Sequence, residues 1–400
     1  MSERRACIEC LRRSWLLSRL GSFLERTATG KVGRRSPELL RLSNEDLVEV
    51  VAPGGAGARL VKEVEACGEA WFAERLEEAD CWAICRHDDR YPPGLRDADD
   101  APWALLGRGD LALLEAIEPQ AAVTIVGSRR ATSYGREVAR DLARELAAAG
   151  LVVISGLAFG IDACAHRGAL DAGGRTIAVL GCGPDTSYPA AHRALWRTIG
   201  ETGAVISELP PGSTPWRWSF PARNRVMAAL AGMTVVVEAA ARSGSLITAD
   251  LAAELGRDLG AVPGPITSRA SAGPNDLLAG GACLVRDAQD VLDAMLGVGA
   301  KPLQRTGPPL DEELATVLAA VEAGATNADA VAVAIGSASP GASGAGDPDG
   351  ATAGARGPSA ARASAALARL ELLGYLATTP TGTFTRTLLV TPPTPVARLQ

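Results

Sequence analysis

Short apolar runs bounded by glycine alternate with amphipathic segments between residues 121 and 263. Runs of four or five apolar residues are typical of parallel strands buried on both faces, and the intervening segments repeat their apolar positions at helical spacing. This alternation predicts an α/β domain with a doubly wound, mainly parallel sheet. The expected strands are 122–126, 151–154, 176–180, 204–207, 234–237 and 261–263, and the expected helices include 134–149, 162–172, 190–199 and 246–259.

The chain on either side of this domain has a different pattern. Apolar positions at helical spacing in 39–51 and 60–79 predict a helical N-terminal module. Helical patterns at 311–323 and 360–375, followed by two expected strands around 380–382, predict a winged-helix-like unit. The Gly-, Ala-, Ser- and Pro-rich stretch 336–358 within it is expected to be a disordered insertion. The predicted domains are the helical module at 1–100, the α/β domain at 101–299, a linker at 300–310 and the winged-helix-like unit at 311–400.

Charge is unevenly distributed along the chain. The 400 residues carry a net charge of −6, yet residues 121–230 hold 12 arginines against 8 acidic residues. A negative total does not exclude a local positive patch that attracts a polyanion. The only lysines are Lys31, Lys62 and Lys301. Their absence from the α/β domain excludes a P-loop lysine and a Schiff-base lysine there.

The most informative segment runs from Thr214 to Arg225, between Glu208 and Glu238, and the chain has no acidic residue between those two glutamates. Arginines there can bind phosphates without a competing carboxylate nearby, and aromatic rings offer faces on which unpaired bases stack. The alternative is that the rings fill a core from which the arginines extend to solvent. Residue types alone leave both interpretations open. The residues concerned are Arg217, Arg223, Arg225, Trp216, Trp218 and Phe220.

Five loops follow the expected strands, and we expect them to line one rim, because the carboxyl ends of parallel strands meet at one edge of a sheet. The first of these turns lacks G-x-G-x-x-G. The second strand ends in Ser155-Gly156, where a dinucleotide-binding strand would end in an acidic residue. These departures argue against a nicotinamide cofactor. The loops are 126–129, 155–162, 181–189, 214–225 and 238–245.

No convincing catalytic set is visible, and the chain is not predicted to be an enzyme. Asp162 opens an expected helix, where an aspartate more often caps than catalyses. His166 lies four residues further on and could pair with it. His192 has no obvious partner and is expected at the surface. The serines of the five loops have no visible histidine and carboxylate partners of the nucleophilic kind.

The eight cysteines are expected to be free thiols rather than a disulfide framework. Cys7-x-x-Cys10 and Cys81-x-x-x-Cys85-x-His87 could share a zinc ion. The second spacing is loose and the separation is long, so no metal and no other cofactor are predicted. The N-terminus has no apolar signal core, and no apolar run approaches the roughly 18 residues that span a bilayer. We therefore expect a cytoplasmic protein without a membrane partner.

Six motifs occur in order along the chain. They are Gly127-Ser-Arg129, Ser155-Gly-x-Ala-x-Gly-Ile-Asp162, Gly181-x-Gly-x-x-x-x-Tyr-Pro189, Phe220-Pro-x-Arg-Asn-Arg225, Val237-Glu-Ala with Ser243-Gly-Ser-Leu-Ile-Thr248, and Val262-Pro-Gly264 with Gly273-x-Asn275 and Gly280-Gly-Ala282. Together they resemble the DNA-processing protein A (DprA/Smf) family over residues 90–296. The resemblance implies an extended Rossmann-like core that binds single-stranded DNA, forms a homodimer and helps to load the RecA recombinase, typically during natural transformation. The family is not known as an enzyme.

The resemblance also assigns roles to individual residues. The family's phosphate-gripping arginine corresponds to Arg129, the basic residue three before its Phe-Pro to Arg217, and the base-contacting aromatic to Phe220. An arginine at the second position can grip a phosphate bidentately. The predicted DNA contacts are Gly127, Ser128, Arg129, Gly156, Gly160, Asp162, Arg217, Phe220, Arg223, Asn224, Arg225, Ser243, Gly244 and Ser245.

Two other functions are weighed against this one. Related Rossmann-like families bind nucleotides or cleave nucleoside monophosphates, and Glu238 could serve there as an acid or nucleophile. Their expected Pro-Gly-Gly-x-Gly-Thr loop is absent from this chain, however. The third candidate is a scaffold that binds only protein. Because the six motifs occur together, single-stranded DNA binding is the favoured function.

Overall fold

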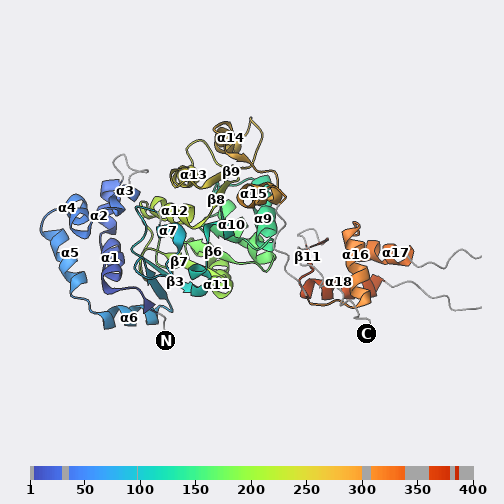
Figure 1. Ribbon diagram of the computed structural model, residues 1–400, viewed down its shortest axis with the longest axis horizontal. Helices are drawn as coiled ribbons and strands as arrows, with labels where there is room; N and C mark the ends of the chain where they lie inside the picture. The colour runs from blue at the N-terminus through green and yellow to red at the C-terminus, as the bar shows by residue number, and fades with distance from the viewer. Residues whose placement is uncertain are drawn as a thin grey trace, which may run out of the picture. The chain divides into compact units, whose positions relative to one another are not determined.

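The computed structural model describes residues 4–28, 36–96, 98–299, 308–337, 360–378 and 383–386. The chain divides into two compact units (Figure 1). The first contains nearly all of residues 1–301, and the second contains residues 302–400. Within the described ranges, no helix is long and apolar enough to cross a membrane.

The first unit contains a ten-stranded sheet with the order β1-β2-β3-β7-β6-β5-β4-β8-β9-β10. Neighbouring strands are parallel except where β3 pairs with β2 and β7. The strands are β1 (Arg4–Arg5), β2 (Trp82–Cys85), β3 (Ala104–Gly109), β4 (Ala122–Val126), β5 (Val152–Ser155), β6 (Thr176–Val179), β7 (Ala204–Ser207), β8 (Met233–Val236), β9 (Asp258–Ala261) and β10 (Cys283–Leu284).

This sheet confirms the predicted doubly wound, mainly parallel α/β fold. From β4 the chain proceeds through β5 and β6 to β7 on one side, and it then places β8, β9 and β10 on the other. The order therefore reverses between β4 and β8, which is where ligands bind in such sheets. The six expected strands are all present, although β9 begins three residues before its predicted start. Strands β1, β2, β3 and β10 were not predicted.

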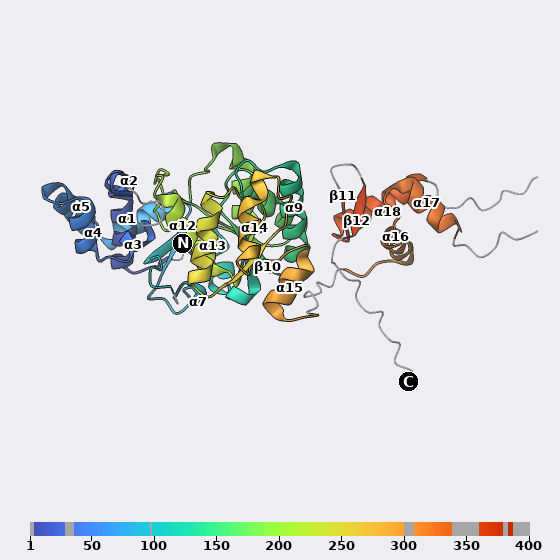
Figure 2. The same cartoon turned by 90° about the horizontal axis from the view of Figure 1, so that it is seen from above.

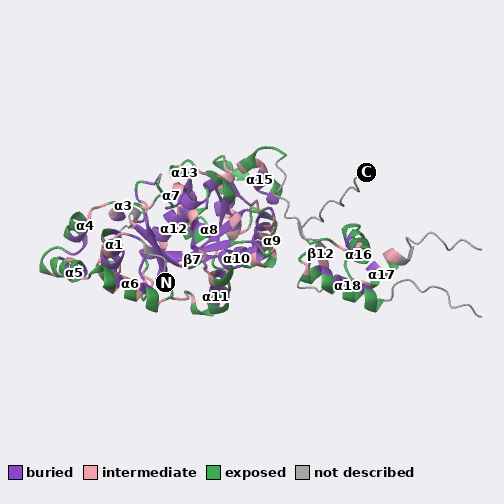
Figure 3. Ribbon diagram, turned by 60° about the horizontal axis from the view of Figure 1, so that its bottom comes forward, coloured by how far each residue is buried: buried purple, intermediate pink, exposed green. Residues whose placement is uncertain are grey.

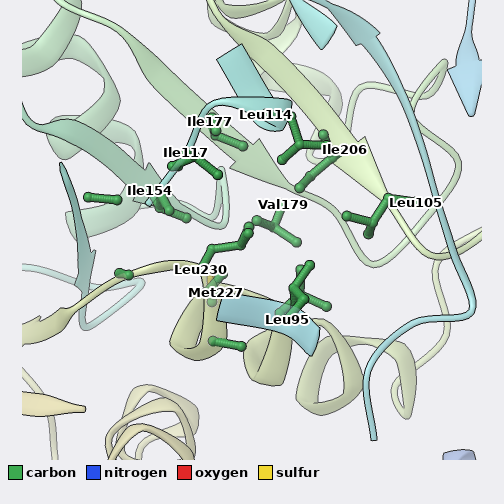
Figure 4. Packing of buried hydrophobic residues seen from close by; sticks show 14 of the residues in the cluster. Leu95, Leu105, Leu114, Ile117, Ile154, Ile177, Val179, Ile206, Met227 and Leu230 are labelled. Atoms are coloured by element: carbon green, nitrogen blue, oxygen red, sulfur yellow. The ribbon is translucent and has the colours of Figure 1, made fainter. Parts of the chain in front are cut away.

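Alternation along the strands gives the sheet two apolar faces. Ile177 and Val179 of β6 pack in the same core as Met227 and Leu230 of helix α12 (Ser219–Leu230) (Figure 4). Ala178 faces the opposite way and packs with a separate cluster that includes Trp196 and Ile199. Fully burying an aliphatic side chain of this size contributes about 1.5–3 kcal/mol, so both layers of helices are needed to hold the sheet.

Helices cover the sheet, and their outer faces are exposed while the strands between them are buried (Figure 3). Helix α12 lies beside helix α13 (Gly244–Glu254) (Figure 2). Helix α13 ends at Glu254 rather than at the predicted residue 259, because Gly256 adopts a φ of 66° and β9 follows at once. The remaining helices of this part are α7 (Pro93–Arg96), α8 (Leu111–Glu115), α9 (Ser133–Ala148), α10 (Ile161–Asp171), α11 (Arg193–Thr202), α13 (Gly244–Glu254), α14 (Ala272–Ala279) and α15 (Ala288–Leu296), with 3-10 turns at Pro119–Ala121, Ala190–His192 and Arg269–Ser271.

The N-terminal residues are mainly helical, as predicted, but they belong to the same unit as the sheet. Strand β2 lies before the predicted boundary at residue 100 and pairs with β3, so the sheet begins inside the expected helical module. The division into domains at that residue stays a prediction. The helices are α1 (Ile8–Arg19), α2 (Gly21–Ala28), α3 (Ser36–Leu40), α4 (Asn44–Val51), α5 (Gly55–Glu65) and α6 (Glu69–Glu78).

The second unit has a core of its own, formed by its helices and its hairpin. Asp311 caps its first helix by accepting a hydrogen bond from the Leu314 N–H at 2.8 Å. Three helices followed by an antiparallel pair agree with the predicted elements, except that the second helix was not predicted, and the winged-helix assignment stays a prediction. Residues 300–307 of the expected linker (300–310) and residues 338–358 of the expected insertion (336–358) lie outside the described residues. The elements are α16 (Glu312–Glu322), α17 (Ala328–Ser337), α18 (Ala360–Leu372), β11 (Leu376–Thr378) and β12 (Phe384–Arg386).

Candidate nucleic-acid interface

A cavity of about 690 Å³ lies beyond the carboxyl ends of β4 and β8, at the point where the strand order reverses. All five predicted loops contribute to its wall, so their expected convergence on one rim is confirmed. We call it the rim cavity. Its lining residues include Gly127, Ser128, Arg129, Arg130, Ala158, Asp162, Tyr188, Arg217, Phe220, Arg223, Asn224, Ser243, Gly244 and Ser245.

The rim cavity is strongly cationic. Arg129, Arg130, Arg217 and Arg223 line it, and the acidic side chain in its lining is Asp162. The first three arginines are exposed. Because Asp162 is buried, a polyanion entering from solvent meets guanidinium groups before any carboxylate. Such a surface attracts phosphates and gains affinity by releasing their counterions.

Aromatic rings accompany these cations. The Arg129 guanidinium lies over the Phe220 ring, 5.2 Å from its centroid, and the Tyr188 ring lies 5.5 Å from Phe220. Tyr188 is 41% exposed and Phe159 is 47% exposed. A smaller cavity of about 120 Å³ is lined by these three rings together with Arg129 and Arg223. Arginines that can bind phosphates and rings that can stack on unpaired bases thus lie next to each other.

Sequence reasoning missed three residues of this arrangement: Phe159, Tyr188 and Arg130. Phe159 and Tyr188 stand in two of the predicted rim loops, and Arg130 directly follows the Gly127-Ser-Arg129 motif. Phe159 and Tyr188 could have been identified as stacking residues, because each is an aromatic residue in a loop at the ligand-binding edge of the sheet. The prediction considered only the aromatic residues at 216–220.

Arg223 forms part of the floor of the rim cavity. One of its terminal nitrogens donates to the carbonyls of Gly156 at 2.6 Å and Val179 at 2.5 Å, and its Nε donates to Asn224 at 3.0 Å. Burial lowers the pKa of this guanidinium, and Asp162 opposes that shift. A Cβ on Gly156 would overlap the guanidinium. Gly156 therefore contributes to the site indirectly, because its lack of a side chain leaves room for Arg223.

Asp162 stiffens the loop after β5. One carboxylate oxygen accepts hydrogen bonds from the Gly156 N–H at 3.1 Å and the Ala158 N–H at 3.4 Å. Burial raises the pKa of Asp162, while Arg223 lowers it. The N–H donors belong to the loop before α10 and not to the helix itself, so Asp162 orders that loop and does not cap the helix, which was the role that the sequence favoured. Gly160 does not line the rim cavity, but its φ of 78° brings the backbone against the Ser128 carbonyl, where no side chain fits.

Two expectations about histidines are wrong. His166 does not pair with Asp162, because its Nδ1 lies 2.7 Å from the Thr176 hydroxyl. His192 is buried rather than at the surface, and its Nδ1 donates to the Leu157 carbonyl at 2.9 Å. His192 thus holds the backbone of the loop after β5, whereas His166 contacts a side chain at the start of β6. Sequence spacing reveals neither contact.

The Arg-aromatic segment divides between the two interpretations that the sequence left open. Arg217 and Phe220 line the rim cavity. Trp216 and Trp218 instead pack with the N-terminal helices, and the Trp218 Nε1–H donates to the Gly21 carbonyl at 3.1 Å. The segment is also not a loop throughout, because helix α12 begins at Ser219.

Arg225 was wrongly predicted to be free of carboxylates and able to bind phosphate. It is buried, donates to Glu208 at 2.7 Å and lies 3.6 Å from an Asp100 oxygen. It is absent from the lining of the rim cavity. Neutralisation by two partners from other segments makes it a structural cation. Its nearest acidic neighbours in space were invisible in the local sequence.

Backbone groups complete the wall. Ser243 caps α13, its hydroxyl lying 2.7 Å from that of Ser245, and the first turn of this helix, including Gly244, lines the rim cavity. Unpaired N–H groups at a helix start favour an anion. Asn224 anchors this turn by donating to the Gly244 carbonyl at 3.2 Å. The Ser128 hydroxyl accepts from the Arg130 N–H at 3.1 Å, which holds the first loop in a turn.

Glu238 is occupied by the first rim loop. It is buried, and its two carboxylate oxygens accept hydrogen bonds from the Thr132 N–H at 2.9 Å and the Thr132 hydroxyl at 2.6 Å. Its carbonyl accepts from the Ser128 N–H at 2.6 Å. Glu238 does not line the rim cavity. The carboxylate therefore organises the loop that carries Arg129 and is not presented to a ligand.

Comparison with known proteins agrees with this geometry. The family model described as DNA recombination-mediator protein A matches residues 82–296. The putative DNA processing protein DprA of Mycobacterium tuberculosis is 47% identical over 218 residues, 54% of this chain and 56% of that protein. The chain thus spans about half the length of that relative. DNA processing protein DprA of Streptococcus pneumoniae is 46% identical over 209 residues, 51% of this chain and 71% of that protein. Its X-ray structure matches with a TM-score of 0.55 and 35% identity, covering 67% of this chain and 95% of the other.

Proposed function

The chain belongs to the DNA recombination-mediator protein A family, and from that premise we propose that it binds single-stranded DNA at the rim cavity. The observation that carries the proposal is the stack of Arg129 on Phe220, 5.2 Å from guanidinium to ring centroid, within a cavity that Arg217 also lines. The two arginines bind successive phosphates, and the ring receives a base.

The preference for a single strand follows from the rings. Duplex DNA presents its phosphates outward but keeps its bases stacked on one another, so Phe220, Tyr188 and Phe159 would gain nothing from it. In an unpaired strand every base has a free face, and each base stacked on an aromatic side chain contributes about 1–3 kcal/mol. The exposed Tyr188 and Phe159 extend the stacking surface beyond Phe220.

The site is proposed to bind rather than to catalyse. Asp162 is buried under two backbone N–H donors, and Glu238 is bound by Thr132. These contacts give both carboxylates a structural role, which favours binding over the proton transfer or attack on a sugar that cleavage of a nucleoside monophosphate would require. Incubation with nucleoside monophosphates should therefore release no base.

Titration of fluorescently labelled oligonucleotides tests the proposal. We expect the anisotropy of a single-stranded oligonucleotide to rise at lower protein concentration than that of the matching duplex, and its affinity to fall steeply with salt. Equal affinity for the two, or binding that ignores salt, would contradict it. The comparison must be made at one stated salt concentration.

The wider role is carried by the family. We propose that the protein forms a homodimer, protects single-stranded DNA and loads the RecA recombinase on it during natural transformation or other DNA processing, in the cytoplasm. Light scattering of the full chain tests the dimer. A RecA filament assay on DNA coated with single-strand-binding protein tests the loading, since a mediator should shorten the lag before filaments form.

A further inference from the structure

Four side chains of types that can bind a metal meet at the edge of the sheet, far along the sequence from the rim residues. They are Cys7, Cys10, Cys85 and His87, and their ligand atoms all lie within 4.8 Å of one another. Cys10 lies in α1, and Cys85 is the last residue of β2. The parallel pairing of β1 with β2, which sets Arg5 beside Ile84, brings the two segments together.

The spacing of these atoms fits a tetrahedral metal. Bonds of about 2.3 Å to sulfur and 2.0–2.1 Å to nitrogen place the ligand atoms of a tetrahedral zinc site roughly 3.5–3.8 Å apart. The Nδ1 of His87 lies 3.4 Å from the Sγ of Cys7 and 3.4 Å from the Sγ of Cys10. The Cys7 N–H lies 3.4 Å from the Cys85 Sγ, to which it donates, as backbone N–H groups do around metal-bound sulfurs.

We propose that Cys7, Cys10, Cys85 and His87 bind a structural zinc ion. Three sulfurs and one imidazole nitrogen are a donor set that selects zinc over the hard cations magnesium and calcium. Four protein ligands leave no open position, so the metal would hold the fold and would not bind a substrate. The sequence predicted no metal because the spacing of Cys81, Cys85 and His87 is loose and their separation from Cys7 and Cys10 is long. The pairing of β1 with β2 removes that separation in space.

Cys81 is excluded by strand geometry. It lies four residues before Cys85, so the two are separated by roughly 13 Å along an extended chain. Its Sγ instead donates to the Ala79 carbonyl at 3.3 Å. The true partner of Cys85 is His87, two residues later in the turn that follows β2, together with the Cys-x-x-Cys pair at the start of α1.

The proposed ion would clamp the N-terminal helices to the sheet. Cys10 and Cys85 belong to a buried cluster with Leu11, Phe72 and Leu106, so the site lies at one end of a core shared by helices and strands. The clamp would also reach the segment that carries Arg217, because the last turn of α1 and the start of α2 hold it. The Ser18 hydroxyl lies 2.9 Å from that of Ser213, and Gly21 accepts from Trp218.

The first test is metal analysis of the full chain, expressed in zinc-supplemented medium and purified under reducing conditions. We expect about one zinc ion per chain, and Co²⁺ added to the metal-free protein should give the visible absorption of a tetrahedral thiolate site. Protein that contains no zinc and gives no such band with Co²⁺ would overturn the proposal. A disulfide between any two of Cys7, Cys10 and Cys85, found in protein purified with a reducing agent, would also overturn the proposal.

Matched variants locate the ion. Cys7→Ser and Cys85→Ser should lose zinc, and Cys81→Ser should retain it, because Cys81 lies in the same cluster of buried side chains but outside the four ligands. Zinc lost from all three variants equally would contradict the assignment. If a ligand variant does not fold, the Co²⁺ titration of the unaltered chain still decides the matter. The outcome is independent of DNA binding, since no ligand lines the rim cavity.

Discussion

The Phe220 ring has a charged neighbour and an aromatic one. Arg129 stacks on it, Tyr188 lies beside it, and the ring itself is only partly buried. This exposure distinguishes it from Trp218, which is 3% exposed and hydrogen-bonded to the N-terminal helices. At the residue scale, a side chain can therefore contribute to DNA binding only if the fold leaves it exposed at the rim cavity.

Replacing Phe220 by alanine should weaken binding of single-stranded DNA by about 5- to 150-fold, because stacking of one base on an aromatic ring contributes about 1–3 kcal/mol. Anisotropy titration at fixed salt measures the change. Phe23→Ala is the control, since Phe23 packs against the buried cluster that contains Leu17 and Trp218 and does not line the rim cavity. An unchanged affinity for the Phe220 variant would place the bases elsewhere.

Arg225 is expected to matter for folding and not for DNA. Arg225→Met would leave Glu208 and Asp100 without their partner, and breaking a buried ion pair from one side costs about 3–5 kcal/mol. Urea unfolding followed by tryptophan fluorescence measures the loss. Arg286→Met is the control: the Arg286 side chain is 68% exposed in its ion pair with Asp290, so its effect should be far smaller. If Arg225→Met kept full stability, the buried pair would not be a structural element.

At the residue scale, sequence and structure agree where a motif fixes a local turn and disagree where distant segments meet. Arg129, Arg217 and Phe220 were placed correctly in one cavity. The ion pair of Arg225 with Glu208, and the contact of His192 with Leu157, join residues 17 and 35 positions apart. Spacing along the chain carries no signal for such pairs, so they could not be predicted.

At the scale of elements, the six strands β4 to β9 were predictable because each is a short apolar run with glycine nearby, whereas β1, β2, β3 and β10 were missed. Helix α12 was missed, and the reason is physical: residues 222–230 are all buried. A helix covered on every side has no polar face and so lacks the 3.6-residue period. Pro221 does not interrupt the helix, because it lies in the first turn, where proline is tolerated.

The loop after β5 packs against helix α12 because Gly156 has no side chain and so leaves room for the Arg223 guanidinium. Gly156→Ala would push a methyl group into the Arg223 guanidinium and break its hydrogen bonds to the Gly156 and Val179 carbonyls. We expect weaker binding of single-stranded DNA and a loss of about 1–3 kcal/mol in stability, because buried donors are left unpaired. Affinity and urea midpoint are measured on the same sample.

Gly55→Ala is the matched control for this substitution. Gly55 lies at the start of α5 on the N-terminal side, and an added Cβ would meet nothing within 4 Å. It should leave affinity unchanged and keep or slightly raise stability, since alanine favours helix over glycine. Should Gly156→Ala behave like this control, Arg223 would not depend on the loop for its position.

At the scale of the whole molecule, the two units have separate hydrophobic cores. All seven tryptophans precede residue 219 and so report on the first unit alone. In the second unit, the two arginines of α18 are engaged: Arg362 pairs with Glu313 at 2.9 Å and Arg369 with Asp311 at 3.4 Å. Neutralised cations give this helix little attraction for DNA.

We therefore expect a chain ending at residue 301 to fold and to bind single-stranded DNA as tightly as the full chain. Tryptophan fluorescence should show the same urea midpoint, because the core of the first unit stays complete. Anisotropy titration compares the two affinities. A large loss on truncation would mean that residues 302–400 take part in binding, and the rim cavity would then be only part of the interface.

Guanidinium groups of the rim cavity are central to the proposed function, because they are expected to bind the phosphates of a single strand. The most direct measurement is the salt dependence of single-stranded DNA affinity for the unaltered chain and for Arg129→Ala, with Arg286→Ala as control. In Arg129→Ala, the slope of log affinity against log salt should become shallower by about 0.7 for each phosphate that the protein no longer neutralises. The slope of the control should stay unchanged. An unaltered slope and affinity in Arg129→Ala would contradict phosphate binding at the rim cavity.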